Sequence, residues 1–177
     1  MSKGMNLGTI RVGLLAYGAI GHEHNLAVQN TNGLELLAVC DTNPERVEAA
    51  MELAPQATAF SDATEMLDSG LLDLVVISTP PNSHYEWAKE SLVRGIHVVL
   101  EKPIALSLSD ARLISEASSS SGKHVFCVMQ NRFAPPSVWL KGLVDAGDLG
   151  EIYQVHIQCF WNRDDSYYAA SNWRGTL

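Results

Sequence analysis

The sequence Thr9-Ile-Arg-Val-Gly-Leu-Leu-Ala-Tyr-Gly-Ala-Ile-Gly21 decides the fold of this chain. Its apolar residues between Ile10 and Leu15 predict a short β-strand, and the small residues that follow allow a tight turn into a helix. The first N–H groups of that helix have no partners inside it, and together with the helix dipole they suit a pyrophosphate. A second apolar strand over 34–40 ends in Asp41, where a carboxylate can accept hydrogen bonds from an adenosine ribose. The stretch therefore predicts a dinucleotide-binding unit.

The glycine pattern of this unit departs from the usual Gly-x-Gly-x-x-Gly, because Ala16 stands at the first position. Alanine costs little there if its φ is negative, and it is unfavourable only if the turn needs a left-handed conformation. A turn of small residues also occurs in α/β proteins that bind no dinucleotide. The strand, the helix and the distal Asp41 together favour the dinucleotide interpretation.

The composition is that of a globular chain with a packed core, with 46% hydrophobic and 18% charged residues among 177. This length allows one full domain, or one domain and part of a second. The 12 basic and 20 acidic residues give a net charge of −8, which repels phosphate backbones and anionic lipids. We therefore expect no nucleic-acid partner and no membrane association, and no apolar run is long enough to span a bilayer.

The three cysteines, at positions 40, 127 and 159, lie in apolar strand-like segments and share no metal-ligand spacing. We expect them to be buried thiols, and we expect no metal site. Their odd number and the lack of a secretory leader favour the reducing cytoplasm. Residues 1–8 are polar and contain glycine, so we expect a flexible tail there.

Apolar strand-like segments alternate with amphipathic helical segments as far as residue 130. This alternation predicts an α/β fold with a doubly wound parallel (Rossmann) sheet over residues 9–130. We expect Asn43 and Ser61 to cap the second and third helices. The expected strands are 10–15, 34–40, 57–60, 73–78, 96–100 and 123–129, and the expected helices are 20–30, 45–53, 62–68, 83–94 and 107–121.

The pattern changes after residue 130, and residues 131–177 predict a crossover into the first part of an α+β open-sheet second domain. A helix there ends at Ala146-Gly147, and a long run from Glu151 to Trp161 has the mixed pattern of a strand with one wet face. One strand is too few to bury a sheet face. We therefore expect the second domain to be incomplete, and its exposed strand to favour self-association.

Four polar clusters follow expected strands: Ala16–Gly21, Asp41-Thr42, Thr79–His84 and Glu101–Pro103. Ligands of a doubly wound sheet bind outside the carboxyl ends of its strands, so these clusters converge on one edge. Each has a plainer explanation when taken alone. Asp41 suits a solvated strand end, the prolines after Thr79 suit a strand stop, and His84 suits a cap or surface position.

Lys102 follows a buried strand and precedes a proline, which would place it beside the nicotinamide end of a bound dinucleotide. There an ammonium can bind a substrate hydroxyl, stabilise a developing alkoxide, or transfer its proton. The plainer alternative is a surface lysine paired with Glu101.

Five motifs in this order resemble the Gfo/Idh/MocA (glucose–fructose oxidoreductase / inositol dehydrogenase) family of nicotinamide-dependent sugar and polyol dehydrogenases. They are Val12–Gly21, Ser78–His84, Glu101-Lys-Pro103, Gln130–Phe133 and Tyr167–Thr176. The resemblance implies a Rossmann domain followed by a second-domain sheet that commonly forms dimers and tetramers, so a homo-oligomer is expected.

The resemblance also implies roles for individual residues. Residues 18–21 would hold the pyrophosphate and Asp41 the ribose. The middle of the cofactor groove would be lined by Thr79, Pro80, Asn82 and His84. Lys102 would be the catalytic lysine, while Gln130, Asn131 and Arg132 would border the substrate side. The cofactor-binding residues expected are Ala16, Gly18, Ala19, Ile20, Gly21, Asp41, Thr42, Thr79, Pro80, Asn82, His84, Glu101, Lys102, Asn131, Trp173 and Arg174.

The function that the resemblance implies is oxidation of a secondary alcohol on a sugar, polyol or related cyclic substrate. NAD is preferred to NADP because Asp41 would repel a 2′-phosphate, although the nearby Arg46 keeps NADP open. Relatives usually continue into an Asp-x-x-x-His pair that supplies a general acid/base, and this chain has no match for it. We therefore expect little turnover from this chain alone. The alternatives are a non-catalytic dinucleotide-binding sensor, which has no need of Lys102, and an interaction scaffold without a ligand.

Overall fold

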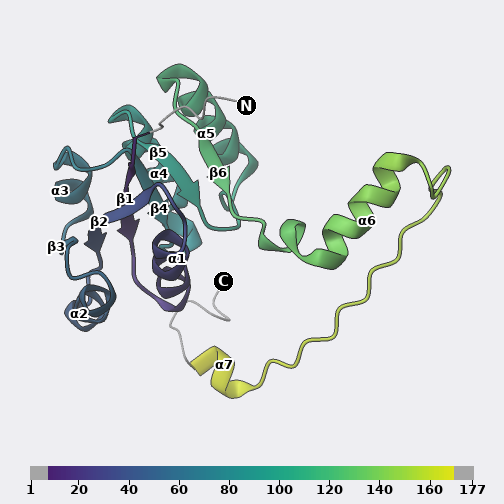
Figure 1. Ribbon diagram of the computed structural model, residues 1–177, viewed down its shortest axis with the longest axis horizontal. Helices are drawn as coiled ribbons and strands as arrows, with labels where there is room; N and C mark the ends of the chain where they lie inside the picture. The colour runs from purple at the N-terminus through teal and green to yellow at the C-terminus, as the bar shows by residue number, and fades with distance from the viewer. Residues whose placement is uncertain (1–7, 170–177) are drawn as a thin grey trace. The chain divides into compact units, whose positions relative to one another are not determined.

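The computed structural model describes residues 8–169, which form two compact units divided after Val128. The first unit is a six-stranded, all-parallel sheet with the strand order β3-β2-β1-β4-β5-β6 and helices on both faces (Figure 1). This arrangement confirms the predicted doubly wound sheet. Its strands are β1 (Ile10–Leu15), β2 (Leu34–Cys40), β3 (Thr58–Phe60), β4 (Leu74–Ile77), β5 (His97–Leu100) and β6 (Val125–Cys127). Its helices are α1 (Ala19–Gln29), α2 (Pro44–Leu53), α3 (Ala63–Asp68), the 3₁₀ turn η1 (Pro81–Ser83), α4 (His84–Val93) and α5 (Leu108–Ser121).

The order of the strands places a crevice at the carboxyl ends of β1 and β4. The chain leaves β1 for β2 and β3 on one side, and then returns to place β4 on the other side of β1. The connections on the two sides of this switch point run in opposite directions, which leaves a gap where loops meet. The predicted dinucleotide loop follows β1 and therefore opens into this crevice.

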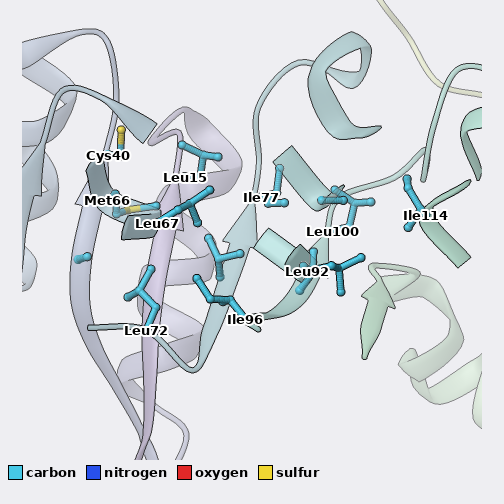
Figure 2. Close-up of a cluster of buried hydrophobic side chains, with 14 residues drawn as sticks. Leu15, Cys40, Met66, Leu67, Leu72, Ile77, Leu92, Ile96, Leu100 and Ile114 are labelled. Carbon is cyan, nitrogen blue, oxygen red and sulfur yellow. The ribbon is translucent and has the colours of Figure 1, made fainter. Parts of the chain in front are cut away.

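Two apolar cores lie on opposite faces of the sheet. On one face, side chains of α3, α4 and α5 pack on the sheet, and Figure 2 shows Met66, Leu92 and Ile114 among them. On the other face, Val28 of α1 and Ala50 of α2 pack on the sheet. Burial of a leucine- or isoleucine-sized side chain contributes about 1.5–3 kcal/mol, so this double cover explains why the central strands are continuous apolar runs.

Side-chain caps fix the starts of three helices in the first unit. Asn43 accepts the Glu45 N–H at 2.9 Å at the start of α2, as predicted. The expected cap at Ser61 is wrong, because Asp62 accepts the Glu65 N–H at 2.9 Å and α3 begins one residue later. A carboxylate at this position also interacts favourably with the helix dipole. Ser107 caps α5.

The described residues of the second unit contain one 3₁₀ turn and two α-helices. The 3₁₀ turn η2 (Gln130–Phe133) precedes α6 (Pro135–Ala146), and α7 (Asp165–Ala169) comes last. Helix α6 begins with a proline and ends at Gly147, whose φ is +76°, which confirms the predicted stop. None of the helices within residues 8–169 combines the length and apolar character required to cross a bilayer.

The strand expected from Glu151 to Trp161 is wrong. Residues 152–164 form neither helix nor strand, and Ile157 and Phe160 are exposed. A strand needs a neighbour to satisfy its main-chain N–H and C=O groups, and the described part of the second unit provides no other strand. The alternating pattern alone therefore does not form a sheet here.

Candidate functional site

The loop after β1 is held by bonds to the neighbouring strands. The Ala16 N–H donates to the Cys40 carbonyl at 2.8 Å, and the Ser78 hydroxyl donates to the Ala16 carbonyl at 2.7 Å. The Tyr17 N–H donates to Asp41 Oδ2 at 2.7 Å. Segments at the ends of β2 and β4 thus fix the loop from both sides.

Ala16 adopts a left-handed conformation, with φ at +72°. Alanine costs little at this position only if its φ is negative. The positive φ in the structure excludes that possibility. An L-residue in this region brings its Cβ close to a carbonyl oxygen, which costs about 1–2 kcal/mol. The bonds to Cys40 and Ser78 impose this conformation, so the alanine is accommodated under strain.

Gly18 and Gly21 make the start of α1 suitable for an anion. A Cβ on Gly21 would lie 2.6 Å from the Ala16 carbonyl oxygen, so only glycine lets the helix approach the loop this closely. Gly18 has no atom within 4 Å of an added Cβ and supplies no side-chain cap to α1. The first N–H groups of α1, unlike those of the capped helices, are therefore not occupied by a cap. A pyrophosphate fits these features.

Asp41 is positioned at the end of β2 with 6% of its surface exposed. Its Oδ1 accepts the Asn43 N–H at 2.8 Å, and its Oδ2 accepts the Tyr17 N–H at 2.7 Å. The Arg46 guanidinium lies 3.6 Å from Oδ2 and is itself half exposed. Each carboxylate oxygen has a further lone pair, so Asp41 can order the loop and still accept a ribose hydroxyl.

Two hollows with volumes of about 310 and 400 Å³ lie at this edge of the sheet and have Asp41, Thr42 and Ser61 in common. The smaller one has apolar walls from Val47, Ala59 and Phe60, which suit a flat aromatic base. The larger one brings together five residues expected at the cofactor: Ala16, Asp41, Thr42, Thr79 and Pro80. Asn82 is exposed on η1 and lines neither hollow.

Glu101 and Lys102 follow β5 at the same edge of the sheet. Glu101 is buried, and His24 of α1 lies with Nε2 at 2.9 Å from Glu101 Oε1. The other oxygen, Oε2, accepts the Lys102 N–H at 3.2 Å. Burial raises the pKa of Glu101, but the hydrogen bond and charge of His24, together with Lys102, outweigh it and leave this pKa below its ordinary value. Glu101 is therefore an ionised anchor, and the exposed Lys102 side chain extends from it.

His84 does not lie in the groove where it was expected. Its side chain is fully buried, and its ring nitrogens lie 2.7 Å from the Pro103 carbonyl and 2.9 Å from the Thr79 carbonyl. The 3₁₀ turn η1 before α4 turns the first residue of the helix inward. The ring therefore contacts the loops of the site rather than the space between them.

The remaining expected residues stay predictions. Asn131, with its neighbours Gln130 and Arg132, belongs to the second unit and lies on η2. Trp173 and Arg174 fall outside the described residues. Within residues 8–169, no three His, Cys, Asp or Glu side chains are grouped so as to hold a metal ion.

The cysteines differ in exposure, which corrects the expectation that all three are buried. Cys40 is buried, Cys127 is partly buried and Cys159 is exposed. Burial, reinforced by the charges of Asp41 and Asp62, raises the pKa of Cys40 to about 11. Cys159 is exposed because its expected strand does not form.

Three contributors to the site were not recognised from the sequence: Tyr17, His24 and Ser78. Tyr17 supplies the N–H that Asp41 holds, and its hydroxyl accepts a hydrogen bond from the buried Asn25 at 3.0 Å. His24 was detectable in principle, because it lies one helical turn after Gly21 and therefore on the same face of α1. Ser78 carries the weakest signal, since a serine at a strand end is common.

Comparisons with known proteins agree with this geometry. A family model (GFO_IDH_MocA) described as "Oxidoreductase family, NAD-binding Rossmann fold" matches residues 10–128. Inositol 2-dehydrogenase of Salmonella typhimurium is 29% identical over 151 residues, which are 84% of this chain and 45% of the relative. D-glucoside 3-dehydrogenase of Escherichia coli is 32% identical over 154 residues, which are 86% of this chain and 44% of the relative.

A solved structure extends the likeness to most of the chain. The WlbA dehydrogenase from Bordetella pertussis, in complex with NADH and UDP-GlcNAcA, is 37% identical with a TM-score of 0.90. The match covers 97% of this chain and 49% of that one. The chain thus spans about half the length of the relatives it matches. It belongs to the Gfo/Idh/MocA family of oxidoreductases with an NAD-binding Rossmann fold.

Proposed function

We propose that the complete protein is an NAD-dependent dehydrogenase that oxidises a secondary alcohol of a sugar or polyol-like substrate. The observation that carries this proposal is the convergence of three chemical groups on one sheet edge. The uncapped start of α1 follows β1, Asp41 follows β2 and Lys102 follows β5, and all these strands are parallel. A cofactor extended along this edge can reach each group in turn.

Different residues of the chain bind the cofactor and act on the substrate. The hollows beside Asp41 take the adenosine, with the carboxylate accepting from the ribose. The first amides of α1 hold the pyrophosphate. Bound NAD supplies the acceptor for a hydride from the alcohol carbon. Lys102 would bind the hydroxyl oxygen and pass its proton to solvent as the hydride leaves, while Glu101 fixes the main chain from which the lysine extends.

The assignment of Asp41 is tested by calorimetric titration of NAD and NADP into the wild-type protein and Asp41→Ala. We expect at least a tenfold weaker affinity for NAD in the variant, equal to about 1.4 kcal/mol. Asp68→Ala is the charge-matched control, because Asp68 pairs with Arg94 and lines neither hollow. Unchanged NAD affinity in Asp41→Ala would remove the ribose assignment. Preferred binding of NADP by the wild type would shift that role to Arg46.

We propose a nucleotide-linked sugar acid as the first substrate to test. The WlbA dehydrogenase, whose structure contains UDP-GlcNAcA, is 37% identical over nearly the whole chain, compared with 29% for inositol 2-dehydrogenase of Salmonella typhimurium. The assay follows NADH formation by the complete protein with UDP-GlcNAcA, myo-inositol and a methyl glucoside. Lys102→Met should bind NAD normally and lose at least about 100-fold in turnover. NAD binding without turnover of any alcohol would favour the sensor alternative instead.

A further inference from the structure

His84 joins two loops of the candidate site through both nitrogens of its ring. Nδ1 lies 2.7 Å from the carbonyl oxygen of Pro103, and Nε2 lies 2.9 Å from that of Thr79. Main-chain carbonyl oxygens accept hydrogen bonds and cannot donate them. Each contact is therefore a hydrogen bond only if the ring nitrogen facing it carries a hydrogen. A neutral ring donates to one of the two carbonyls, and an imidazolium donates to both.

The two loops have different places in the site. Thr79 follows β4 and lines the larger hollow. Pro103 comes directly after Lys102 in the loop that follows β5. His84 contacts both loops from the protein interior, because its side chain is fully buried at the start of α4.

Lys102 is restrained on both sides by these contacts. Its own N–H donates to Glu101 Oε2 at 3.2 Å, and the carbonyl of the next residue faces His84. A proline has no N–H, so its carbonyl is the one main-chain hydrogen-bonding group available at that position. With both flanks held, the exposed lysine side chain extends from a fixed main chain.

We propose that His84 is a positioning residue that clamps the Lys102 loop to the loop after β4. This clamp goes beyond the function proposed above, although its effect on turnover rests on the catalytic role of Lys102. A polar ring with no solvent exposure leaves its nitrogens unsatisfied when its partners are lost, so the ring depends on its contacts with the two loop carbonyls. Filling of the apolar core alone would need neither nitrogen.

The test on this chain is hydrogen–deuterium exchange of His84→Phe, which keeps a ring and removes both ring nitrogens. We expect exchange in residues 79–83 and 102–107 to become at least about tenfold faster, because exchange follows the free energy of local opening. Leu92→Ala is the matched control, since Leu92 is a buried apolar residue of the same helix. It should destabilise α4 without a selective effect on the two loops. Equal loop exchange in His84→Phe and Leu92→Ala would overturn the clamp.

Three further measurements test the proposal without His84→Phe, in case that variant does not fold. His84→Gln has one amide donor group and should speed exchange in at least one of the two loops more than Leu92→Ala does. Loop exchange equal to that of Leu92→Ala would count against the clamp. Nitrogen NMR of the wild-type ring should find at least one ring N–H hydrogen-bonded to a loop carbonyl, and a ring without such a bond would contradict the clamp. In the complete enzyme, we expect His84→Gln to lower kcat by about 10- to 100-fold with little change in KM for the alcohol. Loop exchange that responds as expected in a protein without turnover would preserve the clamp and refute only the dehydrogenase proposal.

Discussion

Replacement of Ala16 by glycine should stabilise the first unit. Ala16 has φ at +72°, in the region that costs an L-residue about 1–2 kcal/mol. Glycine removes this strain but loses about 0.4–1 kcal/mol through the greater freedom of its unfolded chain. The balance is a gain of roughly 0.5–1 kcal/mol, because the bonds of the loop to Cys40 and Ser78 involve main-chain atoms that glycine retains.

The assays are urea unfolding and thermal unfolding of Ala16→Gly, both followed by circular dichroism. The expected gain corresponds to a rise of roughly 2–5 °C in melting temperature for a unit of this size. Gly122→Ala is the reverse control, because Gly122 has φ at +66° and an added Cβ meets no atom within 4 Å. It measures the left-handed penalty without a clash and should destabilise by about 1 kcal/mol or more. The reasoning would be refuted if Ala16→Gly lowered the free energy of unfolding while Gly122→Ala also lowered it. Residue 16 would then not be strained, although the left-handed penalty exists elsewhere in the same protein.

Three further predictions concern separate parts of the molecule. Gly21→Ala should weaken NAD binding about tenfold or more and destabilise by about 1–3 kcal/mol, because its Cβ would lie 2.6 Å from a main-chain carbonyl oxygen; calorimetry with unchanged affinity would contradict this. The hydrogen bonds from Arg11 hold the pKa of Asp73 at about 2, below the ordinary value, so this half-exposed pair stabilises above about pH 4 and loses its effect as pH falls toward 2. Asp73→Asn should therefore cost about 0.5–1 kcal/mol at neutral pH and almost nothing near pH 2 in urea unfolding, and a difference that persists in acid would refute the ion-pair origin. Cys159 should react rapidly with a thiol reagent at mildly alkaline pH while Cys40, whose pKa burial raises to about 11, stays protected until unfolding; loss of the fast phase in Cys159→Ser checks the assignment.

The sheet was predictable from the sequence because its strands are buried on both faces. Continuous apolar runs such as 74–77, separated by amphipathic segments, leave few alternatives to a parallel sheet covered by helices. The start of α2 was predictable for a local reason, since Asn43 and the proline that follows suit the first turn of a helix on their own.

Other features depend on contacts between distant residues, and the sequence pattern does not reveal them. The φ of Ala16 is set by partners at positions 40 and 78, and the inward direction of His84 by carbonyls on two loops. The expected strand at 151–161 has a suitable alternation, but alternation cannot supply the neighbouring strand that a ladder requires.

The bonds of Asp41 to Tyr17 and Asn43 have a consequence for redesign of cofactor preference. The obvious route from NAD to NADP replaces this acid with a small neutral residue, to admit a 2′-phosphate. That change would also release two main-chain donors, so the turn that we propose to hold the diphosphate would loosen as the repulsion of the 2′-phosphate is removed. The choice between NAD and NADP and the affinity for either cofactor therefore depend on the same side chain. A successful redesign has to supply another acceptor for the Tyr17 N–H.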